Sequence, residues 1–230
     1  MLHRILKFTQ KYGFGATVSH AFNRAFKSLV PPVRQVFCAN LAEFQPSSEL
    51  EDQPIKIQAF QSLNKIPSML LEELFLRGTI DNRKPYSRDI VTAFLNWLFS
   101  RGAVFWACFE DENLVGYLWS LRGSRENPRY HFFPLGIRDV VFLAHEIFPP
   151  YRGRELNRKM THLVLGEMKT CGIERVYVDV EISNIWSLKS FSKTLFMPVA
   201  QARMKNFGKR QIVVWRHQKQ SLSTSAIQKS

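Results

Sequence analysis

One stretch of this 230-residue chain, residues 139–196, constrains its fold more than any other. The run from Val140 to Phe148 is almost continuously apolar, which predicts a strand buried on both faces. Two prolines at 149–150 end the strand, because proline cannot donate to a strand ladder. A helix with one apolar face follows, Gly172 closes it in the left-handed conformation, and residues 175–181 alternate as the next strand. The stretch therefore predicts a strand, a turn, a helix and a second strand.

The turn between the first strand and the helix is a candidate anion site. Its sequence is Tyr151-Arg152-Gly153-Arg154, so two arginines stand at the helix entrance. The free N–H groups and the positive dipole end of a helix favour phosphate at this place.

Two sets of residues in this stretch match a known signature. The first is residues 147–154, with the sequence IFPPYRGR. The second set, at matching spacings downstream, is Asn184, Ser187, Lys193 and Phe196. On these residues the chain resembles the GNAT family of acyl-CoA-dependent N-acyltransferases, more loosely from about residue 55 to residue 216. The resemblance implies an α+β fold in α/β/α layers, around a mixed central sheet of about six to seven strands.

The resemblance also implies an activity and a donor site. The activity is transfer of an acyl group, acetyl first, from acyl-CoA to the primary amine of a small molecule or an amino sugar. Backbone groups around Ile147 and Phe148, where the strand separates from its neighbour, would hold the thioester and polarise its carbonyl. The pyrophosphate would contact a run of six residues: Arg152, Gly153, Arg154, Glu155, Leu156 and Asn157. Asn184 would lie near the pantetheine arm, with Ser187 and Phe191 at the thioester.

The sequence departs from the family pattern at three places. Glu155 and Asn157 replace two small residues of the loop, Phe191 replaces a tyrosine that often serves as general acid, and Leu195 replaces a glycine. A carboxylate repels the pyrophosphate unless it points away or pairs with a nearby arginine. Phenylalanine cannot protonate the leaving thiolate, but a thiolate leaves readily, so we expect activity to persist.

Glu146 is the first candidate for the base that takes a proton from the amine. It precedes the expected point of strand separation, among residues that are almost all apolar, where acid–base groups are often found. The alternative is a structural acid paired with an arginine. His145 is the second candidate, although it points to the opposite face of a regular strand. Asp179 and Glu181, on one face of the next strand, rank third.

The chain carries a formal net charge of +13, which favours anionic partners such as CoA phosphates, nucleic acid or an acidic membrane surface. Its three cysteines lie far apart and form no metal-binding motif with histidine, so neither a disulfide framework nor a metal site is indicated. With no recognisable secretory signal, we expect a cytoplasmic protein, with peripheral membrane contact left open, or a mitochondrial one if the source is eukaryotic.

The pattern divides the chain into four parts. Residues 1–44 form a basic amphipathic helical arm, whose residues 1–34 could contact a membrane or another anionic partner, and residues 45–54 form a linker. Residues 55–216 form the GNAT-like domain, and residues 217–230 a disordered tail. A homodimer is also left open. Within the domain we expect a strand at 55–60, helices at 68–76 and from Ser87, and hairpins at 103–121 and 199–215.

Two alternatives to acyl transfer from acyl-CoA stay open at this stage. The first is a non-catalytic module of the same fold that binds membrane, RNA or protein through its basic arm. The second is a transferase that uses aminoacyl-tRNA, which the positive charge would suit.

Overall fold

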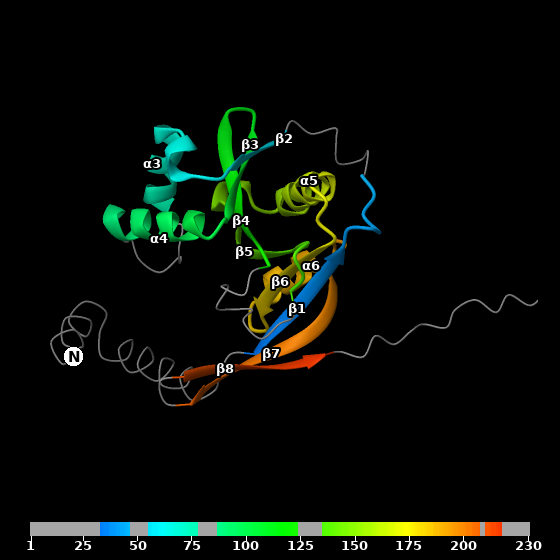
Figure 1. The fold of residues 1–230 in the computed structure, drawn as a ribbon. Coiled ribbons are helices and arrows are strands. Elements are labelled where there is room, and N and C mark those ends of the chain that lie inside the picture. Colours follow the sequence, from blue (N-terminus) through cyan, green and yellow to red (C-terminus); the bar gives the residue numbers. More distant parts are fainter. Residues whose placement is uncertain (1–32, 47–54, 78–86, 124–134, 208–209, 218–230) are drawn as a thin grey trace, which may run out of the picture.

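The computed structural model describes residues 33–46, 55–77, 87–123, 135–207 and 210–217 (Figure 1). Several predicted segments lie outside these ranges: residues 1–32 of the arm, most of the linker, and the tail beyond residue 217. Within the described residues, no helix has the length and apolar character needed to cross a membrane.

A single mixed sheet of eight strands forms the centre of the molecule, in the order β2-β3-β4-β5-β6-β1-β7-β8. The strands are β1 Val33–Asn40, β2 Ile55–Phe60, β3 Val104–Glu110, β4 Asn113–Arg122, β5 Asp139–Ile147, β6 Arg175–Glu181, β7 Met197–Phe207 and β8 Arg210–His217. The described helices are η2 Leu63–Lys65, α3 Ser68–Arg77, α4 Arg88–Ser100, η3 Pro149–Tyr151, α5 Leu156–Thr170 and α6 Ile185–Phe191. Only the pair β5–β6 is parallel, because α5 crosses over between the two strands.

The boundary predicted for the basic arm differs from the structure. Strand β1 falls inside the predicted arm, yet it lies in the sheet between β6 and β7 and pairs antiparallel with both. Val36 and Ala39 of β1 are fully buried. The sheet domain therefore begins near residue 33 and not at 55, and β1 raises the number of strands above the predicted six to seven.

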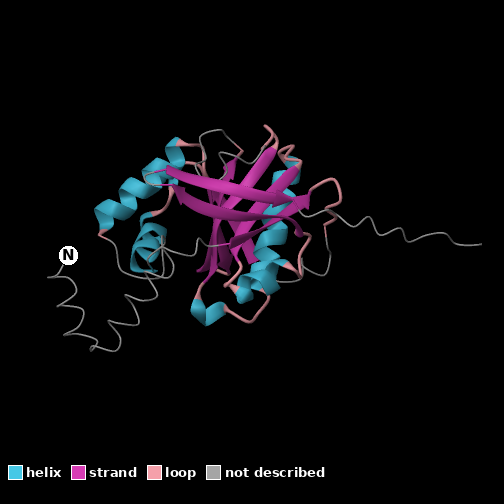
Figure 2. Ribbon diagram, turned by 90° about the horizontal axis from the view of Figure 1, so that it is seen from below, coloured by secondary structure: helices cyan, strands magenta, loops and turns pink. Residues whose placement is uncertain are grey.

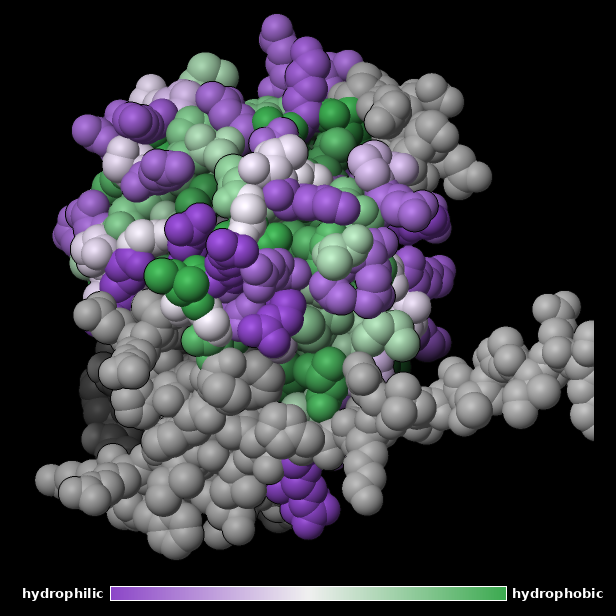
Figure 3. All heavy atoms as spheres, turned by 45° about the vertical axis from the view of Figure 1, so that its right-hand side comes forward, coloured by the Kyte–Doolittle hydropathy of each residue, from purple (hydrophilic) through white to green (hydrophobic). Residues whose placement is uncertain are grey.

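Helices cover both faces of the sheet (Figure 2). On one face, α5 buries Met160 and Val164 against residues of β5 and β6, such as Phe142 and Val178. On the other face, α3 and α4 bury Leu74 and Leu95 against β3 and β4. In the view of Figure 3, hydrophilic residues on the outside are interleaved with hydrophobic ones.

The two helices on the second face begin at, or one residue after, the predicted positions. Ser68 is the first residue of α3, and the hydroxyl of Ser87 accepts a hydrogen bond from Ile90 N–H as the cap of α4. The buried residues of α4 are Val91, Leu95 and Leu98.

Helix α5 ends as the sequence predicts. Gly172 has a φ of +73°, in the left-handed region, and directly precedes the turn into β6. An ion pair between the buried Asp139 and the half-exposed Arg175 then holds β6 beside β5: Asp139 accepts hydrogen bonds from Arg175 Nε at 2.8 Å and Nη2 at 3.0 Å. The same carboxylate accepts the Gly136 N–H at 2.6 Å. These contacts fix the parallel register at the start of both strands.

Candidate active site

Strand β5 pairs with β6 over its first four residues only, from Asp139 to Phe142. At this point the pairing of β5 with β4 shifts register, so that Leu143 is an extra residue between the pairs made by Phe142 and Ala144. A bulge of this kind bends a strand and changes which face its side chains take. Residues 143–147 of β5 and 179–181 of β6 do not pair with each other, and we call these two segments the splay. The predicted separation of the two strands is present.

The bulge determines where the two candidate bases point. Ile147 belongs to the apolar cluster under α5, whereas Ala144 and Phe148 pack in the cluster under α3 and α4. Since side chains alternate along a strand, His145 faces α5 and Glu146 faces the α3–α4 side. The structure therefore brings the two candidates to opposite faces of the splay, as the sequence predicts.

Backbone donors at the splay follow from the same alternation. The N–H of Phe148 donates to the carbonyl oxygen of Val115 in β4 at 2.9 Å. In an antiparallel pair the next N–H along the strand points the other way, so the N–H of Ile147 points toward the splay. Of the two residues predicted to polarise a carbonyl, Ile147 is placed to do so, and the Phe148 N–H is already bonded.

Strands β4 and β5 approach closely at Gly116, opposite Ile147. A Cβ atom at Gly116 would lie 2.5 Å from the backbone oxygen of Glu146 and 2.6 Å from Ile147 Cδ1. Only glycine fits between the strands here. A glycine inside a strand is the sequence signal for such an approach.

Two neighbours hold the Glu146 side chain. The hydroxyl of Tyr117, from β4, donates to Oε2 at 3.0 Å, and Nη2 of Arg152 lies 3.3 Å from Oε1. The Glu146 side chain retains 19% of its solvent exposure, whereas Tyr117 is buried. Burial, followed by the nearby Glu146 charge, raises the pKa of Tyr117, which therefore stays a hydrogen-bond donor. The structure thus contains the arginine pairing that was the alternative to a catalytic role.

His145 lies against α5 and α6. The residue as a whole is half-buried, but its Nε2 atom has no solvent exposure and no hydrogen-bond partner among the described residues. Burial lowers its pKa from 6.5 to about 4, and a hydrogen bond with Asn157 opposes this in part. Because that bond favours the protonated form, Nδ1–H donates to Asn157 and Nε2 carries a lone pair. The ring of Phe191 meets His145 edge-on at 5.8 Å.

Residues 152–157, which we call the donor loop, lead into the N-terminus of α5. Gly153 and Glu155 both have positive φ, +82° and +57°. Glu155 thus adopts the backbone conformation of the glycine that the family pattern has at its position, at a cost of about 1 kcal/mol for a residue with a Cβ. No side chain caps the helix, so its first N–H groups are free to meet an anion.

The arginines of this region all have carboxylate partners. Arg152 donates from Nε to the carbonyl oxygen of Ile147 at 2.9 Å, in addition to its contact with Glu146. Arg154 pairs with Glu110 at the end of β3, with one hydrogen bond of 2.9 Å. Glu155, which is half-exposed, lies 3.6 Å from Arg158. The pairing expected to reduce repulsion at Glu155 is therefore present.

The remaining predicted residues lie on α5 and α6 or directly before α6. The Asn157 side chain bonds to Ser190 as well as to His145. Asn184 caps α6 by accepting the Ser187 N–H at 3.2 Å. Phe191 is a core residue that stacks on Phe37 and meets Phe196 edge-on. Asn157 and Phe191 thus contact His145 on the α5 side of the splay.

The third-ranked bases do not join this site. The Asp179 side chain is buried and forms an ion pair with Arg34 of β1. Glu181 accepts a hydrogen bond from Ser183 at 2.8 Å. Asp179 is thus a structural acid that ties β1 to β6.

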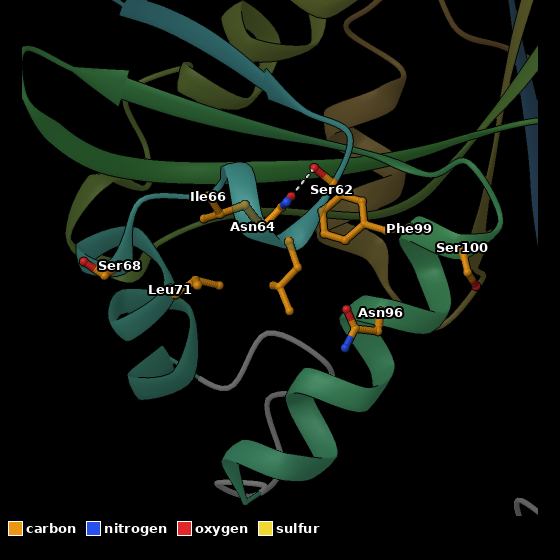
Figure 4. A pocket seen from close by; sticks show the side chains of 9 residues that line it. Ser62, Asn64, Ile66, Ser68, Leu71, Asn96, Phe99 and Ser100 are labelled. Carbon is orange, nitrogen blue, oxygen red and sulfur yellow. Dashed lines mark hydrogen bonds between the residues drawn. The ribbon is translucent and has the colours of Figure 1, made fainter.

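A cleft of about 650 Å³ on the described surface lies between η2, α3 and α4 and is lined by uncharged residues, including Leu71, Asn96 and Phe99 (Figure 4). Ser62 and Asn64, which also line it, share a hydrogen bond of 2.7 Å. A smaller cleft, of about 240 Å³, lies along α5. The larger cleft contains none of the candidate site residues, so its size does not make it the reaction site.

Residues 69–195, more than half of the chain, match the model of the Acetyltransferase (GNAT) family. The chain belongs to the GNAT acetyltransferase family. No protein of curated function matches the sequence.

Solved structures of GNAT proteins share its fold. The glucosamine N-acetyltransferase region of a fungal multi-domain GH3 β-N-acetylglucosaminidase superposes with a TM-score of 0.53 and 12% identity, covering 74% of this chain and 20% of that one. A putative GNAT acetyltransferase from Novosphingobium aromaticivorans superposes with a TM-score of 0.47 and 17% identity, covering 75% of this chain and 61% of that one. A tandem GNAT protein of clavulanic acid biosynthesis superposes with a TM-score of 0.49 and 12% identity, covering 73% of this chain and 50% of that one. The chain thus spans less than two thirds of each of these proteins, and the likeness to the first of them shows the fold alone.

The residues present fit the acyl-CoA that GNAT proteins use. The donor loop offers an uncapped helix N-terminus beside three arginines, and the splay exposes backbone N–H groups next to it. Among the described residues, no group of three or more His, Cys, Asp or Glu side chains is arranged to hold a metal ion.

Proposed function

We propose that this GNAT protein is an acyl-CoA-dependent N-acyltransferase that moves an acyl group, acetyl first, to the primary amine of a small molecule or an amino sugar. The observation that carries the proposal is the placement of Glu146 at the open end of β5, on the α3–α4 face of the sheet and within reach of Arg152 from the donor loop. A thioester on the α5 side and an amine on the α3–α4 side can then meet across the splay.

Binding of the donor follows from the geometry of the loop. The pyrophosphate lies at the N-terminus of α5, where free N–H groups and arginine side chains neutralise its charge. The pantetheine arm runs along the unpaired edge of β5, past Asn184 and Ser187. Its thioester carbonyl accepts the N–H of Ile147, which polarises the carbon for attack.

Transfer then requires that the acceptor nitrogen lose two protons. Glu146 takes the first from the ammonium form, and the free amine attacks the thioester carbon. The C–N bond forms and the C–S bond breaks, so that CoA leaves as a thiolate. Phe191 has no proton to give, and the thiolate takes the second proton of the attacking nitrogen, through water, to give the amide and the CoA thiol. Before the donor binds, Tyr117 and Arg152 hold Glu146 from two sides.

The two alternatives stated for the sequence draw no support from the residues that the structure describes. The basic arm lies outside them, so its contact with a membrane, the homodimer and the cytoplasmic location stay predictions.

The test of this function combines a donor-binding measurement with a transfer assay. Calorimetry measures acetyl-CoA affinity, and release of the CoA thiol measures transfer to a panel of primary amines and amino sugars. We expect Glu146→Gln to lower kcat by about 10² to 10⁴-fold, as for loss of a general base, with unchanged acetyl-CoA affinity. Glutamine can still accept from Tyr117, so the fold should be kept.

Glu167→Gln is the matched control, because Glu167 is an exposed carboxylate near the other end of α5. Turnover of Glu146→Gln equal to that of the wild type would remove Glu146 from the mechanism. Failure of the wild type to bind acetyl-CoA, or to acylate any amine of the panel, would refute the function itself.

A further inference from the structure

The charges of this chain are divided unevenly along its sequence. All 19 acidic residues lie between Glu43 and Glu181, whereas six lysines and arginines precede Glu43 and nine follow Glu181. The middle of the chain is thus close to neutral, and the net charge of +13 comes from its two ends. Such a distribution gives one part of a protein surface a strong preference for anionic partners.

The fold brings the two ends of the chain together. Strand β1 lies between β6 and β7, and β8 pairs with β7 (Figure 1). Helix α6 packs on β1, where Phe191 stacks on Phe37 with ring centroids 6.0 Å apart. The elements β1, α6, β7 and β8 therefore form one half of the domain, and none of them contains an Asp or a Glu.

Exposed apolar side chains gather at the start of α6. Ile182, Ile185 and Trp186 retain 45%, 54% and 77% of their solvent exposure. Lys189 lies over the Trp186 ring, 5.8 Å from its centroid, and shares the outer side of α6 with it. Single exposed apolar residues are common on proteins, but a group of neighbours that includes an exposed tryptophan marks a contact surface.

Two exposed arginines of the sheet lie on the same face as α6. In the register of the sheet, Arg203 of β7 and Arg216 of β8 share the face of Val33 and Phe37 of β1. Val33 is the partner of Arg203 and accepts the Ile182 N–H at 3.0 Å, so Arg203 lies about two strand spacings, or roughly 10 Å, from Ile182. We call this group of residues the α6 surface: Ile182, Ile185, Trp186, Lys189, Arg203 and Arg216.

The acids closest to the α6 surface along the chain point away from it. Val180 packs in the cluster under α5, so the alternation of β6 places Asp179 and Glu181 on the other face of the sheet. There Asp179 forms its ion pair with Arg34. The strand that leads into the α6 surface thus leaves the positive charge of this surface in place.

A bilayer with anionic lipids matches the α6 surface better than a nucleic acid does. Tryptophan favours the membrane interface, isoleucine the acyl region beneath it, and lysine and arginine the headgroup phosphates. A nucleic acid would engage the cations and Trp186 but leave Ile182 and Ile185 in water. The basic arm predicted from the sequence joins the chain at the same edge, because β1 begins at Val33, next to Ile182.

We propose that the α6 surface docks this protein on a membrane that contains anionic lipids, with Ile182, Ile185 and Trp186 in the bilayer interface and the cations at headgroup phosphates. The docking site adds to the acyltransferase and does not depend on it, because none of its residues belongs to the donor loop or the splay. Ile182 directly follows splay residues 179–181, so a docked molecule holds the open end of its sheet beside the lipid headgroups.

Co-sedimentation of the full-length protein with lipid vesicles, without donor or acceptor, tests the docking site. We expect the wild type to bind vesicles of phosphatidylcholine with added phosphatidylglycerol about tenfold or more tightly than phosphatidylcholine alone, and less tightly as salt is added. Trp186→Ala should weaken binding to the anionic vesicles by about fivefold or more. Its fold should be kept, since Trp186 is exposed.

Trp97→Ala is the matched control for the tryptophan. Trp97 is also exposed and also has a cation over its ring, Arg101 at 4.6 Å, but it lies on α4, on the other face of the sheet. Indole fluorescence shifts to shorter wavelength when the ring leaves water. The wild type and Trp97→Ala should show this shift on addition of anionic vesicles, and Trp186→Ala should lack it.

A second pair of variants tests the charge of the α6 surface. Arg203→Gln should weaken binding to the anionic vesicles several-fold and leave binding to phosphatidylcholine unchanged, because the arginine meets headgroup charge. Lys56→Gln removes the same charge from β2, an exposed position at the opposite edge of the sheet, and should bind as the wild type does.

Three results would overturn the proposal. The first is unaltered vesicle binding by Trp186→Ala, and the second is an equal loss in Trp186→Ala and Trp97→Ala. The third is a wild type that binds neither kind of vesicle; its retention of single-stranded RNA would then assign the cations to nucleic acid. Acyl transfer is measured in solution without vesicles, so the proposed function and this inference fail separately.

Discussion

The buried His145 predicts a dependence of stability on pH that one substitution should remove. In the unfolded chain its pKa is about 6.5, and in the folded protein burial lowers the pKa to about 4. Between these values the unfolded state binds more protons than the folded state. The free energy of unfolding should therefore fall as the pH falls through this window, and rise as the pH rises.

The size of the effect follows from the two pKa values. Proton linkage gives a loss of about 2 kcal/mol from this one residue between pH 7 and pH 5. For a chain of this length, that corresponds to a fall of roughly 4 to 7 °C in Tm. Other carboxylates and histidines titrate in the same range, so the difference between two proteins must be measured.

His145→Gln supplies that difference. Glutamine does not titrate and can still bond to Asn157, so the fold should be kept. Urea unfolding of both proteins at steps from pH 7.5 to pH 5 gives the difference in unfolding free energy. We expect His145→Gln to lose less stability than the wild type, by about 2 kcal/mol at pH 5. Parallel curves for the two proteins would show that His145 is not held neutral, and the description of its surroundings would be wrong.

Two further predictions concern backbone positions at the site. Gly116→Ala should destabilise the protein by about 1 to 3 kcal/mol in urea unfolding, because its Cβ would meet the backbone of Glu146 at 2.5 Å. Gly166→Ala is the control: its Cβ meets only ring atoms of Phe44 at 3.8 Å or more, so the substitution should stabilise α5 slightly. An equal loss of unfolding free energy in both variants would count against the close approach at Gly116. Glu155→Gly should tighten acetyl-CoA binding in calorimetry, because it removes a negative charge from the donor loop and because glycine adopts the left-handed conformation of this position without strain. Weaker binding would show that Glu155 itself contacts the donor.

The unit from β5 to β6 could be predicted because its signals are local. An apolar run, two prolines, a helical repeat and Gly172 are all read within a few residues of the structure that they specify. The opposite orientation of His145 and Glu146 also follows, because successive side chains along a strand point to opposite faces of the sheet.

Strand β1 could not be found in this way. Its eight residues, VRQVFCAN, mix polar and apolar side chains and follow a basic segment. Its partners are β6 and β7, near the far end of the chain, and Asp179 pairs with Arg34 across that distance. Pairing between segments so far apart leaves no periodic signal in either of them.

The site shows the same division between local and distant information. The donor loop was predicted from its arginines and from the resemblance. The contacts of Glu146 were not, because Tyr117 comes from β4 and meets it only through the register of the sheet. The bulge at Leu143, which opens the splay, likewise depends on β4 and cannot be seen in β5 alone.

The contact of Arg152 connects the two halves of the proposed reaction. In the structure this arginine lies 3.3 Å from Glu146, while it is also one of the residues predicted to meet the pyrophosphate. A pyrophosphate carries more negative charge than one carboxylate, so a bound donor competes with Glu146 for the guanidinium. As Arg152 turns toward the donor, Glu146 keeps only the hydrogen bond from Tyr117 and is free to meet an ammonium group. On this argument the base becomes available after the donor has bound, and the donor should bind before the amine.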